Sequence, residues 1–407
     1  MRRIFLFGYY GFNNIGDEAI LEAIVRQLRL EMPDIDITAL SYNASFTSSQ
    51  YGIRAVSRNR FLDVFRCIRR SDLVMSGGGS IVQDVTSSRS LFYYLGIIIL
   101  AKMLGKKVAC YGNGFGPVKR PINRLFVKWV MAHVDLITVR DSESLELLQK
   151  IGIRQPIHIT ADAAFSLLPL FDEGMASPKK SEKCVGISVR DWNGRERYSK
   201  MIASCADQMV EQGYTVCFFP MQHPSDTQVS NEIIGLMHHP AEMIERAGTP
   251  NEVIRSIADM DFMIGMRLHS LIFASIAGVP CLGVSYESKV SHFLRQVNQP
   301  ETEPIPALTR ENLWEAISRL LDHREEHRRE LMEKREELYE KAADTARIIC
   351  DFLMEENTIE NGGNDECTDS PSDHGRNQQT VKRNDGKTRA AMHYDTKPGN
   401  GHDGTRG

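Results

Sequence analysis

Closely spaced cysteines are missing from this 407-residue chain. Its eight cysteines include no C-x-x-C pair, so no structural zinc site is predicted. Cys110, Cys217 and Cys281 lie inside short apolar segments of the kind that form strands. We interpret the cysteines as small buried side chains of a protein kept in a reducing cytosol.

The chain also lacks an apolar run of the roughly 20 residues that a helix needs to cross a bilayer. Its most apolar segment, residues 91–100, ends before Lys102. We expect a buried helix there, with contact to a membrane surface as the alternative. The apolar start of the chain ends at Gly8 without a small-residue cleavage site, which favours a first strand over a signal peptide.

Neither sign of charge dominates. The chain has 49 lysines and arginines against 53 aspartates and glutamates, a net charge of −4. This balance gives no support for nucleic-acid binding, which usually needs a broad basic surface. An anionic ligand would have to be held by a local cluster of cations. The length exceeds what one hydrophobic core usually organises and predicts two domains.

The two common phosphate-binding loops are absent as well. The first loop, residues 8–16 (GYYGFNNIG), joins an apolar run to an amphipathic segment. It is not G-x-G-x-x-G, and no lysine follows its last glycine, so a dinucleotide or nucleoside-triphosphate loop is not indicated. Asn13, Asn14 and Asp17 could instead bind the hydroxyls of a sugar. The alternative is a glycine-rich turn capped by its asparagine side chains.

Short apolar runs alternate with amphipathic segments along most of the chain. This pattern predicts parallel sheets with helices on both faces. Glycine, proline and charged residues without periodicity indicate a linker. Mixed charges at helical spacing indicate a solvated helix. The loss of apolar residues near the end of the chain indicates a disordered segment. The predicted parts are an N-terminal Rossmann-like domain (1–169), a linker (170–183), a C-terminal Rossmann-like domain (184–322), a charged helix (323–356) and a disordered tail (357–407).

Residues 259–290 carry the clearest indication of chemistry. Arg267 and His269 follow a short apolar run where a helix should begin, and Lys289 follows the next apolar run. Ligands of open α/β sheets bind beyond the carboxyl ends of parallel strands, so we expect these groups at one crevice, together with Arg190. The start of a helix should lower the pKa of His269. The pattern favours an anionic ligand, with a purely structural histidine as the alternative.

Two further glycine-rich loops, residues 77–79 and 112–116, follow predicted strands at the same edge of the first sheet. Asp84 and Asn113 could face the crevice from these loops. A capping or turn role is the alternative for each of them.

Five segments in this order resemble the polysaccharide pyruvyltransferase family, most closely its CsaB-type bacterial members: GYYGFNNIGDEAIL, SGGGSIVQD, YGNGFGP, TVRD and GMRLHSLIFASIAGVPCLGVSYESKV. The resemblance implies a GT-B-like fold with two Rossmann-like domains facing a cleft. It also implies transfer of pyruvate from phosphoenolpyruvate to a sugar as a 4,6-ketal. For CsaB-type enzymes the expected sugar is N-acetylmannosamine, in a lipid-linked precursor of a secondary cell-wall polymer that anchors S-layer-homology domains.

The donor-binding arginines and histidine of that family match Arg190, Arg267 and His269 here. To the donor site we add Lys289, because a carboxylate and a phosphate need separated cationic contacts. His269 and Arg267 are the expected catalytic residues. No step calls for a metal or a cofactor. The expected acceptor side consists of Asn13, Asn14, Asp17, Asp84 and Asn113, of which Asp17 and Asp84 are also candidate bases.

Two other functions fit the same pattern. One is a GT-B nucleotide-sugar glycosyltransferase, in which Glu287 would hold a ribose; the other is a non-catalytic module that binds a sugar or an anion. The expected location is the cytoplasm, at the inner face of the cell membrane if the acceptor is lipid-linked. The sequence carries no prediction of the oligomeric state.

Overall fold

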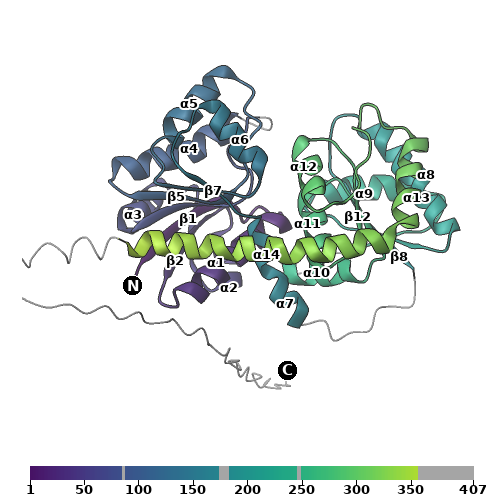
Figure 1. Cartoon of the computed structure of the whole chain (residues 1–407), viewed down its shortest axis with the longest axis horizontal. Coiled ribbons are helices and arrows are strands. Elements are labelled where there is room, and N and C mark those ends of the chain that lie inside the picture. The colour runs from purple at the N-terminus through teal and green to yellow at the C-terminus, as the bar shows by residue number, and fades with distance from the viewer. Residues whose placement is uncertain (85–87, 174–182, 245–248, 356–407) are drawn as a thin grey trace, which may run out of the picture. The chain divides into compact units, whose positions relative to one another are not determined.

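The computed structural model describes residues 1–84, 88–173, 183–244 and 249–355. Two parallel sheets form its framework (Figure 1). The predicted α/β class is therefore confirmed. The predicted tail (357–407) and most of the predicted linker lie outside the described residues. The linker residues before this gap, up to Glu173, belong to a helix.

The first sheet has seven strands in the order β3-β2-β1-β4-β5-β6-β7. Its central strands are buried along nearly their whole length, as expected when helices cover both faces of a parallel sheet. The strands are β1 (Arg3–Tyr10), β2 (Asp36–Ser41), β3 (Arg54–Ser57), β4 (Leu73–Gly77), β5 (Lys107–Asn113), β6 (Leu136–Val139) and β7 (Ile157–Ile159).

Helices connect these strands, with one 3₁₀ turn after β7. They are α1 (Ile15–Glu31), α2 (Ala44–Tyr51), α3 (Phe61–Arg70), α4 (Ser88–Met103), α5 (Pro121–Met131), α6 (Ser142–Ile151), η1 (Ala163–Leu167) and α7 (Leu168–Glu173). Residues of α3, α4, α5 and α6 share one apolar core, whereas α1 and η1 contribute to another.

The second sheet has five strands in the order β10-β9-β8-β11-β12. They are β8 (Cys184–Ser188), β9 (Thr215–Phe218), β10 (Glu242–Met243), β11 (Phe262–Gly265) and β12 (Cys281–Gly283). The helices of this half are α8 (Arg195–Glu211), α9 (Ser225–Leu236), α10 (Pro250–Ala258), α11 (Leu268–Ile276), α12 (Ser288–Gln296) and α13 (Arg310–Asp322).

The strand orders determine where a ligand can bind. In the first sheet the chain reverses its direction of progress between β1 and β4, and in the second between β8 and β11. Such switch points open a crevice at the carboxyl ends of the two strands, because the connecting helices lie on opposite faces. The loops after β1, β4, β8 and β11 are therefore the places to look for a site.

The last described helix, α14 (Arg324–Met354), runs alongside elements of both halves (Figure 1). It packs against α1, η1 and β5 of the first half and against α11 of the second. Leu331, Leu338 and Ile349 on its inner face are fully buried. The charged composition predicted the solvated outer face but gave no indication of this packed face.

Candidate functional site

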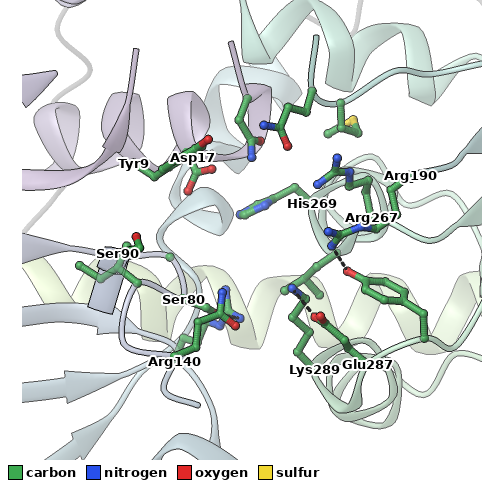
Figure 2. A pocket seen from close by; sticks show the side chains of 18 of the residues that line it. Tyr9, Asp17, Ser80, Ser90, Arg140, Arg190, Arg267, His269, Glu287 and Lys289 are labelled. Carbon is green, nitrogen blue, oxygen red and sulfur yellow. Dashed lines mark hydrogen bonds and ion pairs between the residues drawn. The ribbon is translucent and has the colours of Figure 1, made fainter. Parts of the chain in front are cut away.

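A cavity of about 430 Å³ lies where the loops of the two sheets meet. Asn14 and Asp17 reach it from the region after β1, and Ser80 from the loop after β4. From the second half, Arg190 follows β8 and Arg267 follows β11. Both topological switch points thus contribute to one cavity, as Figure 2 shows.

His269 lies in the first turn of α11 and its ring points toward the side chains of the first half (Figure 2). The side chain is 15% exposed, and Nε2 is 3.8 Å from Oδ2 of Asp162. Nε2 is buried and has no hydrogen-bond partner within the described part of the chain. Burial lowers the pKa of His269 to about 4; Asp162 opposes this shift, and nearby cations led by Arg140 add to it.

The imidazole is therefore neutral at pH 7, and its Nε2 has an unused hydrogen-bonding position beside the cavity. The direction of the pKa shift agrees with the prediction from sequence. Its main cause is different, since burial outweighs every other influence.

Arg267 is fixed by a carboxylate. Its Nε donates to Oδ2 of Asp226 at 2.8 Å, and its Nη2 donates to Oδ1 of the same residue. The Asp226 side chain is completely buried. A two-point contact of this kind holds the guanidinium plane in one orientation, which leaves Nη1 as the nitrogen that Asp226 does not engage.

Arg190 is held by aromatic groups. Its guanidinium lies 5.0 Å from the ring centre of Trp192 and 4.8 Å from that of Tyr286, and Nη1 donates to the Tyr286 hydroxyl at 2.8 Å. Within the described ranges no carboxylate forms an ion pair with Arg190. Its positive charge is thus positioned without being neutralised by a contacting acid.

Two more cations complete the cavity wall. Lys289, in the first turn of α12, pairs with Glu287 at 2.7 Å. Arg140, which follows β6, donates to Asp162 at 2.9 Å and to the hydroxyl of Ser80 at 3.0 Å. The four cations line the same cavity as a neutral imidazole, an arrangement suited to a ligand with more than one negative charge.

Asp17 faces the cavity from the first turn of α1. Burial, with the neighbouring charges of Glu18 and Asp162, raises its pKa to about 7. A carboxyl group in this state can donate a proton near neutral pH. Asn14 lies beside it as the residue that caps α1, its side chain accepting from the backbone N–H of Gly16 at 3.1 Å.

The structure does not bring the remaining candidates to the cavity wall. Asp84 accepts from the backbone N–H groups of Lys119 and Arg120 and from the Asn123 side chain, at the start of α5. Asn113 is fully buried and donates to the carbonyl of Gly78 at 2.9 Å. Asn13 has a positive φ of 58° in the turn before α1.

Several residues of the site were not singled out from the sequence. Asp162 and Asp226 gave no local signal, because their partners are distant in the chain. Arg140 did give one, since it follows a predicted strand just as Arg190 does. Other lining residues that the sequence reasoning left out are Tyr9, Ser80, Gln83, Ser90 and Gln222.

The fold places the protein in a known structural class. A UDP-GlcNAc 2-epimerase from Neisseria meningitidis has a TM-score of 0.61 at 12% identity, covering 87% of this chain and 100% of its own. MnaA from S. aureus gives a TM-score of 0.65 at 13% identity, with 92% and 100% covered. Alr3699/HepE from Anabaena gives 0.58 at 11% identity, with 87% and 100% covered. These likenesses establish a GT-B-like fold.

Sequence comparison identifies the family within this class. The polysaccharide pyruvyl transferase family matches residues 14–288, so the chain belongs to the polysaccharide pyruvyl transferase family and is an enzyme of that family. A relative with the name amylovoran biosynthesis protein AmsJ, from Erwinia amylovora, is 22% identical over 402 residues, covering 80% of this chain and 93% of its own.

Two further properties concern the described residues alone. No helix among them is long and apolar enough to pass through a bilayer. No group of three or more histidine, cysteine, aspartate or glutamate side chains in the described ranges could hold a metal ion.

Proposed function

We propose that the cavity binds phosphoenolpyruvate and transfers its pyruvyl group to two hydroxyls of one sugar unit, releasing phosphate. The observation that carries this proposal is the set of four cations that line one cavity with the neutral His269, in an enzyme of the polysaccharide pyruvyl transferase family. The donor has a carboxylate and a phosphate on adjacent positions of a three-carbon unit. Its two anionic ends call for cationic contacts from more than one direction.

The donor contacts that we propose are Arg190, Arg267, His269 and Lys289. Arg190 makes the strongest of these contacts, because no contacting carboxylate reduces its charge. Arg267 presents Nη1 while Asp226 holds the rest of its guanidinium. Lys289 stabilises the negative charge of the phosphate as it leaves. Charge-assisted contacts of this kind contribute about 1.5–3 kcal/mol each.

In the proposed reaction a proton is added to the methylene carbon of the donor, and an oxocarbenium-like centre forms at the neighbouring carbon. One sugar hydroxyl attacks this centre and loses its proton. The carbon–oxygen bond to phosphate then breaks, and the second hydroxyl closes the ketal and loses its proton. Two protons leave the hydroxyls, one is gained by the methylene carbon and one by the departing phosphate, so the numbers of protons lost and gained are equal.

We assign the proton donor and the proton acceptor from the shifted pKa values of Asp17 and His269. Asp17, with a pKa of about 7, is the proposed donor of the proton to carbon. His269, with a pKa of about 4, is the proposed acceptor of a hydroxyl proton. Asp162, 3.8 Å away, stabilises the imidazolium that results. A positioned acid–base group contributes roughly 10²–10⁴-fold to the rate.

For the acceptor we propose the end of β1 and the loop after it, where Tyr9 at the cavity belongs to a stack of three aromatic rings. Tyr9 lines the cavity and stacks on Phe12 at 4.1 Å, and Phe12 stacks on Tyr42 at 4.7 Å. Such rings suit the apolar face of a sugar. The proposed acceptor is N-acetylmannosamine of a lipid-linked cell-wall polymer precursor, modified as a 4,6-ketal, in line with the CsaB-type resemblance.

The test is phosphate release from phosphoenolpyruvate with a panel of lipid-linked and water-soluble amino sugars. We expect release that depends on one acceptor and that Arg267→Ala reduces by about 10²-fold or more. Arg329→Ala, on the charged helix α14, is the control and should keep full activity.

Phosphoenolpyruvate should raise the melting temperature and UDP-sugars should not. The reverse result, with sugar transfer from a UDP-sugar, would establish the glycosyltransferase alternative and refute the proposal.

A further inference from the structure

Part of the first half comes from a stretch of sequence without acidic residues. The 50 residues between Asp84 and Asp135 contain no aspartate or glutamate, but they contain eight lysines and arginines. The chain as a whole has a net charge of −4, so this local excess is not a general property of the protein. The stretch includes α4 and α5, which pack against each other.

The same two helices expose large apolar side chains. Ile122, Leu125 and Trp129 of α5 are 75%, 68% and 53% exposed, and they follow one another at helical spacing along its outer side. Phe92 of α4 is also exposed, and its ring lies 5.3 Å from that of Phe126. These five residues define what we call the α4–α5 face. Exposed apolar clusters of this kind usually mark a surface that contacts a partner.

Basic side chains surround the α4–α5 face. Lys119, Arg120, Arg124 and Lys128 are all exposed on or just before α5, and Arg89 is exposed in the first turn of α4. Apolar side chains bordered by lysine and arginine match the interface of a bilayer, where the apolar groups enter the acyl boundary and the cations meet anionic headgroups.

The alternatives fit this chemistry less well. Two copies of the face pressed together in a symmetric dimer would bring the same positive charges against each other. The phosphates of a nucleic acid would contact the cations but would leave the apolar side chains exposed to water. We propose that the α4–α5 face docks on the surface of a lipid bilayer that contains anionic lipids.

The position of the face relative to the cavity gives docking a function. Ser90 and Tyr94 of α4 line the cavity, whereas Phe92 of the same helix belongs to the docking face. One helix therefore connects the membrane surface with the reacting sugar. This part of the inference rests on the proposed function: a sugar attached to a lipid carrier would reach the cavity while its carrier stays in the bilayer.

The test is co-sedimentation of the full chain with vesicles of phosphatidylcholine containing roughly one third phosphatidylglycerol. We expect binding at about 0.1 M salt, weaker binding at about 0.5 M salt, and little binding to vesicles of phosphatidylcholine alone. Leu125→Ser should weaken binding about ten-fold, and the double variant Lys119→Glu and Lys128→Glu by about 25-fold or more, about five-fold per lost charge.

A matched control is available on α1. Leu30 is 70% exposed, almost the same as Leu125, but it lies outside the α4–α5 face. Leu30→Ser should bind vesicles as the unaltered chain does. Equal losses from both serine variants, or binding that does not require anionic lipid, would overturn the proposal, as would self-association without lipid that Leu125→Ser abolishes.

A second readout uses Trp129 directly. Brominated lipids should quench its fluorescence when vesicles bind, and Trp129→Phe should remove the quenched signal, since the other tryptophans, Trp192 and Trp314, lie in the second half. Quenching that persists in Trp129→Phe would contradict this docking geometry. Transfer to a water-soluble acceptor without vesicles should be unchanged in Leu125→Ser, which separates failure of docking from failure of the proposed function.

Discussion

Asp17 and His269 face one cavity with pKa values shifted in opposite directions. Burial is the main cause for both, because it disfavours a charged carboxylate and a charged imidazolium alike. The result is an acid that holds its proton up to about pH 7 and a base that remains neutral down to about pH 4. Near neutral pH the two groups are thus in the states that the proposed proton transfers require.

The raised pKa of Asp17 has a cost in stability that can be measured. Between about pH 4 and pH 7 the folded protein binds this proton and the unfolded chain does not, so Asp17 lowers the free energy of unfolding as pH rises through that window. Asp17→Asn should therefore stabilise the protein by roughly 2–4 kcal/mol at pH 8 and hardly at all at pH 4. Denaturant unfolding across this pH range measures the difference.

The control for this variant is Asp34→Asn, at an exposed position, which should change stability by less than about 0.5 kcal/mol at either pH. Activity of Asp17→Asn should fall by about 10²-fold or more. If Asp17→Asn stabilises the protein, relative to the unaltered chain, no more at pH 8 than at pH 4, the carboxyl group is not held protonated by the fold.

Gly16 positions the imidazole from the opposite half of the protein. A methyl group added at Gly16 would overlap the ring of His269. Alanine favours a helix more than glycine does, so an isolated α1 would gain from the change. Gly16→Ala should nevertheless destabilise the protein by about 1–3 kcal/mol and reduce activity by about 10²-fold, as displacement of a reacting group does.

Gly235→Ala is the matched control, because an added methyl group on α9 meets no atom within 4 Å. It should be neutral or stabilise by up to about 1 kcal/mol. Normal phosphate release by Gly16→Ala, at unchanged stability, would mean that the position of the His269 ring does not depend on its contact with Gly16. Unfolding and phosphate-release measurements on both variants decide the matter.

At this scale the sequence predicted the groups that follow parallel strands, among them Arg190, Arg267 and His269, which the structure brings to one cavity. It could not predict Asp162 or Asp226. Asp162 binds Arg140 and lies 3.8 Å from Nε2 of His269, and Asp226 binds Arg267. These partners are distant in the chain, so no local spacing encodes them. Asp84 and Asn113 were singled out from the sequence but do not line the cavity. Their loops were located correctly, but their side chains form hydrogen bonds with the surrounding backbone.

At the scale of elements, the long βα segments were predicted from apolar periodicity and the polar ones were not. Helix α2 (residues 44–51, ASFTSSQY) has little apolar periodicity, and its ends are set by the Asn43 side chain and by Gly52 in a left-handed conformation. Helix α12, which carries Lys289, is also mostly polar. Such elements form because tertiary contacts complete them, which a local pattern does not record.

Helix α14 gives a direct test of that argument. Leu338 is 1% exposed on the inner face, whereas Glu337 on the outer face pairs with Lys334 and Lys341. Leu338→Ala should lower the free energy of unfolding by about 2–4 kcal/mol, since it leaves a cavity. Glu337→Ala should cost less than about 1 kcal/mol, because exposed ion pairs contribute little.

Chemical denaturation of the two variants measures both effects. Comparable small losses would mean that α14 is held by its own charge pairs and is not a structural part of the core. A large loss for Leu338→Ala alone would show that α14 is part of the folded core.

At the scale of the whole molecule, the site is complete only when both sheets contribute. Arg140 comes from the first sheet, while Arg190 and Arg267 come from the second. A dianionic donor between them should join the two halves more firmly. With phosphoenolpyruvate at about 100 times its dissociation constant, we expect about 2.7 kcal/mol of added stability, which for a protein of this size is a melting temperature about 3–4 °C higher.

Arg190→Ala should abolish this ligand-induced increase while leaving the melting temperature of the free protein nearly unchanged, because the lost cation has no contacting acid to leave unpaired. Arg195→Ala is the control: Arg195 lies a few residues further along and pairs with Asp191 and Glu232, and the increase should persist. Hydrogen exchange should slow on ligand binding in the loop after β1 as well as in the first turn of α11. Protection confined to the second half would mean that the donor binds without bridging the two sheets, and transfer to an acceptor held by the first half would then need a further closing step.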